Sequence, residues 1–322
     1  MLFFGVLILA AFYVGWNIGS NDAGNCIGTS IGSGILSYRR GIIFVAVFAL
    51  IGAVFQGSHV MKTIGKGIVT VELSDIAILV ALLSSGIFVT FATFLKLPVS
   101  TSQAIVGGVA GVGLAMFGFD SGNINGAVIR KIVLSWILCP ILTMIMSFVL
   151  YYFLLNFLRK TRNHRLWEKI MRVAVIFSAA YVSYSLGANH AGTAMGVICN
   201  KYPDSGFILT ILGGLAIAVG ALTFSKRVTD TISKNITPLD MAGAFIAQFT
   251  GGLGVHVFSI IGVPISTSQS IVGAIAGVGL VRGIKTIGGR QIFNIVIGWV
   301  AIPVFTALFS FAVYQLLILL GA

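Results

Sequence analysis

Charged residues are scarce in this sequence. Only 9% of its 322 residues are charged, and 57% are hydrophobic. A soluble domain usually has about 25% charged residues, so this composition excludes a soluble protein. The excess of 20 Lys and Arg over 8 Asp and Glu does not indicate nucleic-acid binding, because the basic residues lie between apolar runs, as in cytoplasmic loops. We expect a multi-pass protein of the cell membrane, in contact with the lipid bilayer, and no nucleic-acid partner.

Titratable residues are equally sparse within the apolar runs. Beyond Asp22, His190 and His256, these runs hold little that could act as a base, a nucleophile or a metal cluster. The three cysteines form an odd set without paired spacing, which argues against a disulfide framework and a cysteine metal site. An enzyme is therefore the least favoured class, and we expect no cofactor.

What the sequence does contain is a long internal repeat. PVSTSQAIVGGVAGVGL at 98–114 returns as PISTSQSIVGAIAGVGL at 264–280, and GSNDAGN at 19–25 returns as GANHAGT at 187–193. The offsets of the two pairs are nearly equal. The pairs predict a duplicated unit of almost half the chain.

Two shorter pairs support the duplication. TIGK at 63–66 returns as TISK at 231–234, and a tryptophan four residues before a proline, at 136–140, returns at 299–303. All four pairs follow the same order in both halves, which makes chance resemblance between apolar segments improbable.

Ten apolar runs are long enough to cross a bilayer, which takes about 17–25 residues. The runs lie at 2–36, 41–60, 75–95, 98–118, 127–157, 173–199, 207–224, 241–261, 264–281 and 291–320. The runs 98–118 and 264–281 could instead enter and leave by the same side. If both cross, the halves are inverted and 15 of the 20 basic residues fall on one side; if both are hairpins, the best split is 11 to 9. The bias of basic residues towards the cytoplasm favours crossing.

The predicted fold is therefore an all-α membrane protein. We expect two inverted repeats of about five transmembrane segments each, at 1–158 and 173–322, with broken helices that meet at the bilayer midplane. A basic linker at 159–172 should lie in the cytoplasm and both termini outside.

Asp22 is the only acidic residue inside any of these runs. A charged carboxylate at the bilayer centre costs about 2.5–3.5 kcal/mol on insertion scales, so such residues are functional candidates by default. The glycines and polar residues around it predict an unwound segment whose carbonyl groups, with Asp22, could bind sodium or a proton. The alternative is a small-residue packing face with a neutral, hydrogen-bonded aspartic acid.

The two S-T-S-Q segments predict the anion side of the site. Each follows a proline, which is typical of a helix start. A helix N-terminus offers free N–H groups and a positive dipole end to an anion, and two starts from inverted halves would converge near the midplane. The residues are Ser100, Thr101, Ser102, Gln103, Ser266, Thr267, Ser268 and Gln269. The alternative is two ordinary capped helices.

These motifs together resemble those of the inorganic phosphate transporter (PiT) family over nearly the whole chain. The resemblance implies symport of phosphate with sodium or protons, as a homodimer. It also implies that Ser102, Gln103, Ser268 and Gln269 bind phosphate. The expected cation-binding residues are Asn21, Asp22, Asn25, Asn189 and His190, with Asn21, Asp22 and Asn189 as sodium ligands.

One departure from the family concerns the second half. The family has Asn-Asp in both halves, whereas this sequence has Asn189 followed by His190. A neutral imidazole is a poor sodium ligand, and histidine titrates near neutral pH. We therefore expect at least one altered sodium site, with coupling to one sodium ion or partly to protons.

The departure also leaves the substrate open. Phosphate is the first expectation and sulfate, or another tetrahedral oxyanion, is the alternative. A passive channel on the same duplicated core is a third class, which would only equilibrate the ion, whereas a transporter would concentrate it.

Overall fold

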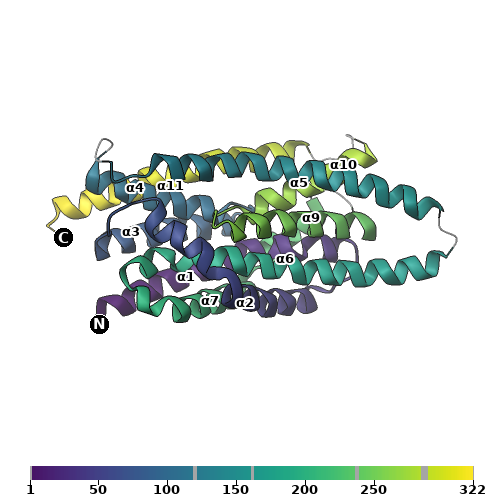
Figure 1. Ribbon diagram of the computed structural model, residues 1–322, viewed down its shortest axis with the longest axis horizontal. Helices are drawn as coiled ribbons and strands as arrows, with labels where there is room; N and C mark the ends of the chain where they lie inside the picture. Colours follow the sequence, from purple (N-terminus) through teal and green to yellow (C-terminus); the bar gives the residue numbers. More distant parts are fainter. Residues whose placement is uncertain (1, 119–121, 161–162, 236–238, 284–288, 322) are drawn as a thin grey trace.

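The computed structural model describes residues 2–118, 122–160, 163–235, 239–283 and 289–321, and its helices lie roughly along one long axis (Figure 1). The α-helices are α1 Leu2–Gly32, α2 Tyr38–Lys62, α3 Asp75–Phe94, α4 Thr101–Phe117, α5 Gly126–Lys160, α6 His164–Lys201, α7 Gly206–Phe224, α8 Lys226–Asn235, α9 Met241–Ile260, α10 Thr267–Arg282 and α11 Gly289–Leu319. A π-helix, η1, covers Thr63–Gly67, and a 3-10 turn, η2, covers Pro203–Ser205. The first turn of α1 and the last turn of α11 lie at the same end of the molecule (Figure 1).

Each predicted apolar run corresponds to one α-helix, but not every helix is long enough to cross a membrane. Within the described residues, eight helices have the length and apolar composition of a membrane span. The runs 98–118 and 264–281 form α4 and α10, which have 17 and 16 residues. A straight crossing takes about 20 residues. α4 and α10 are therefore shorter than a straight crossing, and their crossing stays a prediction.

The shorter helices belong to two helical hairpins, α3–α4 and α9–α10. At the tip of the first hairpin, the carbonyl of Leu97 accepts a hydrogen bond from Asn21 of α1. At the tip of the second, the carbonyl of Ile265 accepts one from Asn189 of α6. Asn21 lies eleven residues before the end of α1, or about 16 Å along the helix axis. Both tips thus end beside the interior of a long helix, as in a re-entrant hairpin.

The prediction of an unwound segment at GSNDAGN is wrong, because α1 is a continuous α-helix through the motif. Its glycines form a packing face. A Cβ on Gly19 would overlap the carbonyl oxygen of Ile217 in α7, and one on Gly24 would lie 2.9 Å from the backbone nitrogen of Thr229 in α8. Small residues allow such close helix contact inside a membrane.

The second motif behaves in the same way. α6 is continuous through GANHAGT, and a Cβ on Gly187 would overlap the carbonyl oxygen of Ala49 in α2. The main-chain carbonyls of both motifs therefore stay within helices, so these motifs offer a cation only their side chains.

The two sequence repeats interlock. α1 packs against α7, α2 against α6, α4 against α11 and α5 against α10, and each pair joins a helix of one half to a helix of the other. α1 and α6 run in opposite directions, since Gly15 lies near Ala194 and Cys26 near Val182. Most of the basic stretch 159–172 extends α5 and α6, while 161–162 lie outside the described residues.

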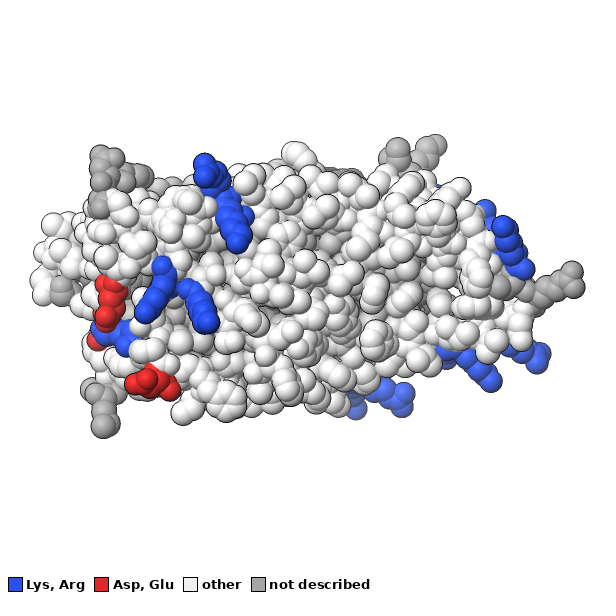
Figure 2. All heavy atoms as spheres, in the orientation of Figure 1, with Lys and Arg blue, Asp and Glu red and all other residues white. Residues whose placement is uncertain are grey.

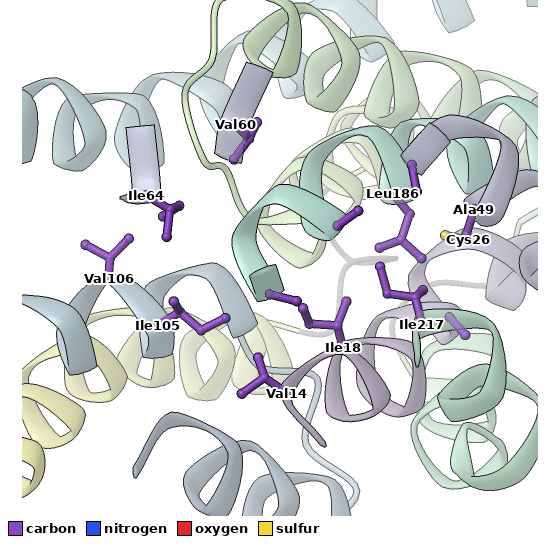
Figure 3. Close-up of a cluster of buried hydrophobic side chains, with 14 of the residues drawn as sticks. Val14, Ile18, Cys26, Ala49, Val60, Ile64, Ile105, Val106, Leu186 and Ile217 are labelled. Carbon is purple, nitrogen blue, oxygen red and sulfur yellow. The ribbon is translucent and has the colours of Figure 1, made fainter. Parts of the chain in front are cut away.

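The core lies where helices of both halves meet. Val14 and Ile18 of α1, Leu186 of α6 and Ile217 of α7 gather there (Figure 3). The outer surface is apolar as well, with Ile137 of α5 55% exposed. A band without charged side chains crosses the middle of the face in Figure 2. This distribution suits a protein surrounded by lipid.

The packing face of α1 can be tested with two alanine substitutions. We expect Gly19→Ala to lower the free energy of unfolding by about 1–3 kcal/mol, because the added Cβ forces α1 and α7 apart. Gly5→Ala is the matched control, since a Cβ on Gly5 meets no atom within 4 Å. Thermal unfolding of the purified protein in detergent measures both, and equal stability of the two variants would contradict the packing account.

Candidate functional site

The Asp22 carboxylate is buried where α1 meets both hairpin tips. The hydroxyl of Thr101, at the start of α4, donates to its Oδ2 over 2.6 Å. Its Oδ1 lies 3.0 Å from the amide nitrogen of Asn25 and 3.2 Å from the hydroxyl of Ser268, at the start of α10. No Lys or Arg of the described residues forms a salt bridge with Asp22. Hydrogen bonds from Asn25 and Thr101 therefore stabilise the carboxylate in place of a basic partner, and the Ser268 hydroxyl lies within reach of it.

His190 occupies the matching position in α6. Its Nε2 forms a 2.9 Å hydrogen bond with the hydroxyl of Thr267, as Asp22 does with Thr101. The same Nε2 lies 3.9 Å from Oδ2 of Asp22, which is too far for a hydrogen bond. The two repeats thus place one carboxylate and one imidazole side by side in the interior.

Asn21 and Asn189 hold the hairpin tips. The Asn21 amide donates to the hydroxyl of Thr93 (2.8 Å) and the carbonyl of Leu97 (3.0 Å), and its oxygen accepts the N–H of Val99 (3.0 Å). Asn189 donates to the carbonyl of Ile265 over 2.6 Å, and its oxygen lies 3.4 Å from the nitrogen of the same residue. An amide oxygen has two lone pairs, so each asparagine retains one for a cation.

The two hairpins also bind each other. Ser102 of α4 donates to the carbonyl of Ile265 over 2.7 Å, and Ser268 of α10 lies 3.0 Å from the carbonyl of Val99. Each serine therefore joins its own hairpin to the tip of the other hairpin. The tips form one continuous polar region around Asp22.

Ser100 and Ser266 cap the two helices. Their hydroxyls accept the backbone N–H groups of Gln103 and Gln269 over 3.3 and 3.2 Å, as N-cap residues do. In this arrangement the ordinary capping role, which was the alternative interpretation, accounts for both serines.

The side-chain oxygens of Gln103 and Gln269 are buried without a hydrogen-bond partner. Both residues line one cavity of about 670 Å³ between α4, α5, α10 and α11. Trp136 and Trp299 line the same cavity. The two glutamines thus share a common space and still have hydrogen-bonding capacity for a ligand.

Sequence reasoning missed two polar groups near the site. Thr93 accepts from Asn21, and Gln248 of α9 donates to the carbonyl of Cys26 over 2.7 Å and accepts from Ser30 and Ser178. A glutamine within the apolar run 241–261 was the available signal. Gln248 ties α9 to α1 and α6 close to the charged motif.

Comparison with known proteins gives consistent results. The model of the phosphate transporter family matches residues 18–310, which include both repeated motif pairs. A protein of Methanocaldococcus jannaschii named "putative phosphate permease" is 32% identical over 96% of each chain. The inorganic phosphate transporter 2-1 of Arabidopsis thaliana is 27% identical over 92% of this chain and 69% of its own.

A solved structure has the same fold. It is described as "the sodium-dependent phosphate transporter", with a TM-score of 0.90 and 28% identity over 99% of this chain and 100% of that chain.

The asparagine contacts at the hairpin tip can be tested by truncation. We expect Asn21→Ala to lower the free energy of unfolding by about 1–3 kcal/mol, because it leaves buried main-chain groups of the tip unsatisfied. Asn156→Ala, at a half-buried position near the end of α5, is the control. If denaturant unfolding shows the same loss in both variants, Asn21 does not hold the tip.

Proposed function

Because the chain belongs to the phosphate transporter family, we propose that this multi-pass membrane protein imports inorganic phosphate by symport with a cation. The family model covers 18–310, and the resemblance predicted from the Asn-Asp motif and the two P-x-S-T-S-Q segments is confirmed. The direction of transport, the coupling ion and the ligands are our proposals.

The observation that carries the proposal is the contact of one carboxylate with both hairpins. Thr101 and Ser268, at the starts of α4 and α10, both lie within hydrogen-bond distance of Asp22. The positive ends of these helices would otherwise attract an anion. A negative Asp22 repels a bound phosphate, since like charges a few ångströms apart interact strongly away from water. A cation that neutralises Asp22 removes this repulsion, so the two ligands bind together.

Sodium is the first choice for this cation. The groups around Asp22 present oxygen atoms, namely the hydroxyls of Thr101 and Ser268 and the side-chain oxygen of Asn25, which is buried without a partner. Hard cations prefer such ligands. The neighbour's description as sodium-dependent supports the choice. A proton on Asp22 would neutralise the same charge, and sodium and proton coupling differ in their dependence on pH.

Phosphate then binds where the two helix starts converge. We assign as its donors the free N–H groups of the first turns and the amides of Gln103 and Gln269. The hydroxyls of Ser102 and Ser268 also donate to it once they release the carbonyls of Ile265 and Val99. A site of neutral donors and helix dipoles can hold an oxyanion without Lys or Arg.

Sulfate remains the second candidate, because such a site recognises tetrahedral geometry as much as charge. Competition between labelled phosphate and unlabelled sulfate or arsenate, with and without sodium, distinguishes the two. We expect arsenate to compete and sulfate to compete weakly.

The topology and assembly follow the same proposal. We place both termini outside and the basic stretch 159–172 in the cytoplasm. This arrangement puts 15 of the 20 basic residues on the inner side if α4 and α10 cross, and 14 if each hairpin enters and leaves by one side, because only Lys96 then moves to a tip. We also propose the family's homodimer as the assembly.

The role of Asp22 in coupling can be tested by Asp22→Asn, which removes the charge and keeps the shape. We expect loss of sodium-driven phosphate accumulation in proteoliposomes, with normal membrane insertion, because no charge remains for sodium to neutralise. Asp204→Asn in the exposed turn η2 is the control. Normal accumulation by Asp22→Asn would make Asp22 structural, whereas equilibration without accumulation by the wild-type protein would indicate a channel.

The second repeat offers a test of stoichiometry. Because His190 replaces a carboxylate, we expect uptake by the wild-type protein to depend on sodium with a Hill coefficient of about one, and His190→Asp to raise it towards about two. Initial uptake rates at a series of sodium concentrations and fixed pH measure both. A wild-type coefficient of about two that His190→Ala leaves unchanged would contradict this assignment.

A further inference from the structure

Two tryptophans related by the sequence repeat have no role in the mechanism described so far. The indole N–H groups of Trp136 and Trp299 are buried without an acceptor, and the side-chain oxygens of Gln103 and Gln269 are buried without a donor. All four residues line the same cavity. Buried polar groups are nearly always paired in native proteins. Two donors and two acceptors without partners in one cavity therefore call for a functional explanation.

The helix register places each tryptophan at the level of one glutamine. A Cβ on Gly107 of α4 would overlap the carbonyl of Pro303 in α11, and one on Gly111 would overlap the carbonyl of Ala307. The two contacts are four residues apart on both helices, so α4 and α11 run parallel and in register. One turn earlier, the same spacing puts Gln103 level with Trp299.

The other pair of helices repeats this register. A Cβ on Gly273 of α10 would overlap the carbonyl of Pro140 in α5, and one on Gly277 would overlap the carbonyl of Met144. One turn earlier, Gln269 is level with Trp136. Each glutamine thus lies level with a tryptophan from the opposite sequence repeat, on a neighbouring helix that lines the same cavity.

We propose that Trp299 and Trp136 are positioning residues for Gln103 and Gln269, which rests on the proposed role of these glutamines in phosphate binding. An indole N–H can only donate a hydrogen bond, so it pairs with the amide oxygen and not with the amide nitrogen. This pairing turns the –NH₂ group of each glutamine towards the substrate. An oxyanion accepts hydrogen bonds, so this is the orientation in which the amide binds it.

In the structure, the two indole N–H groups and the two amide oxygens do not form these hydrogen bonds. In this proposal the indole–amide pairs form when the substrate orders the glutamines. The tryptophans then contribute to affinity without touching phosphate. They also make the position of each glutamine depend on the packing of two helices from different halves, namely α4 on α11 for Gln103 and α10 on α5 for Gln269.

The test uses Trp299→Phe and Trp136→Phe, which keep an aromatic ring and remove the N–H. We expect each to raise the KM for phosphate uptake about five- to tenfold, the loss of one hydrogen bond to a neutral group, and to leave the maximal rate near the wild-type value. Trp16→Phe is the matched control, because its indole N–H bonds to Thr223 over 2.9 Å and Trp16 does not line this cavity. It should leave the KM unchanged.

Combination with Gln103→Ala separates positioning from a general packing effect. If Trp299 acts through Gln103, Trp299→Phe adds nothing to the KM of Gln103→Ala, whereas Trp136→Phe in the same background raises it further. An unchanged KM in Trp299→Phe, or an equal additional rise from both tryptophan substitutions, overturns the inference. A wild-type KM in Gln103→Ala instead overturns the proposed substrate site, and this inference with it.

Discussion

The structure depends on one buried carboxylate held by two helix starts. Asp22 receives hydrogen bonds in a region where the described chain places no Lys or Arg beside it. The bond from Thr101 to Asp22 joins the long helix α1 to the first hairpin, and the amide of Asn25, which donates to both Asp22 and Ser268, joins α1 to the second. A change in the charge of Asp22 therefore acts on the two elements proposed to hold the anion, which is the physical basis for coupled binding.

The interlocked repeats make this arrangement possible. Glycine faces on α1 and α6 bring helices of the opposite half into close contact, and the hairpin tips exchange hydrogen bonds through Ser102 and Ser268. Each hairpin helix also packs on a long helix of the other repeat. The site is thus built from both halves throughout, so neither repeat contains a complete binding region.

Much of this could be predicted from the sequence, because apolar runs and repeated motifs report directly on helices and symmetry. The ten runs match ten helices, and all the predicted site residues lie in or beside the same buried region. The predicted unwinding at GSNDAGN was wrong because glycines in a sequence indicate a helix break and a close packing surface equally well. Crossing and re-entry both stayed open for 98–118 and 264–281, because the length of an apolar run does not reveal where its helix stops inside the bundle. That Gln103 and Trp299 lie at the same level depends on helix register, which only the structure supplies.

Linked binding of phosphate and sodium is the most direct measure of this account. Phosphate should be titrated calorimetrically into the purified protein at several sodium concentrations and fixed pH. If a cation must neutralise Asp22 before the anion binds, phosphate affinity rises with sodium, and phosphate raises the affinity for sodium by the same factor. A phosphate affinity that is independent of both sodium and pH would contradict the account.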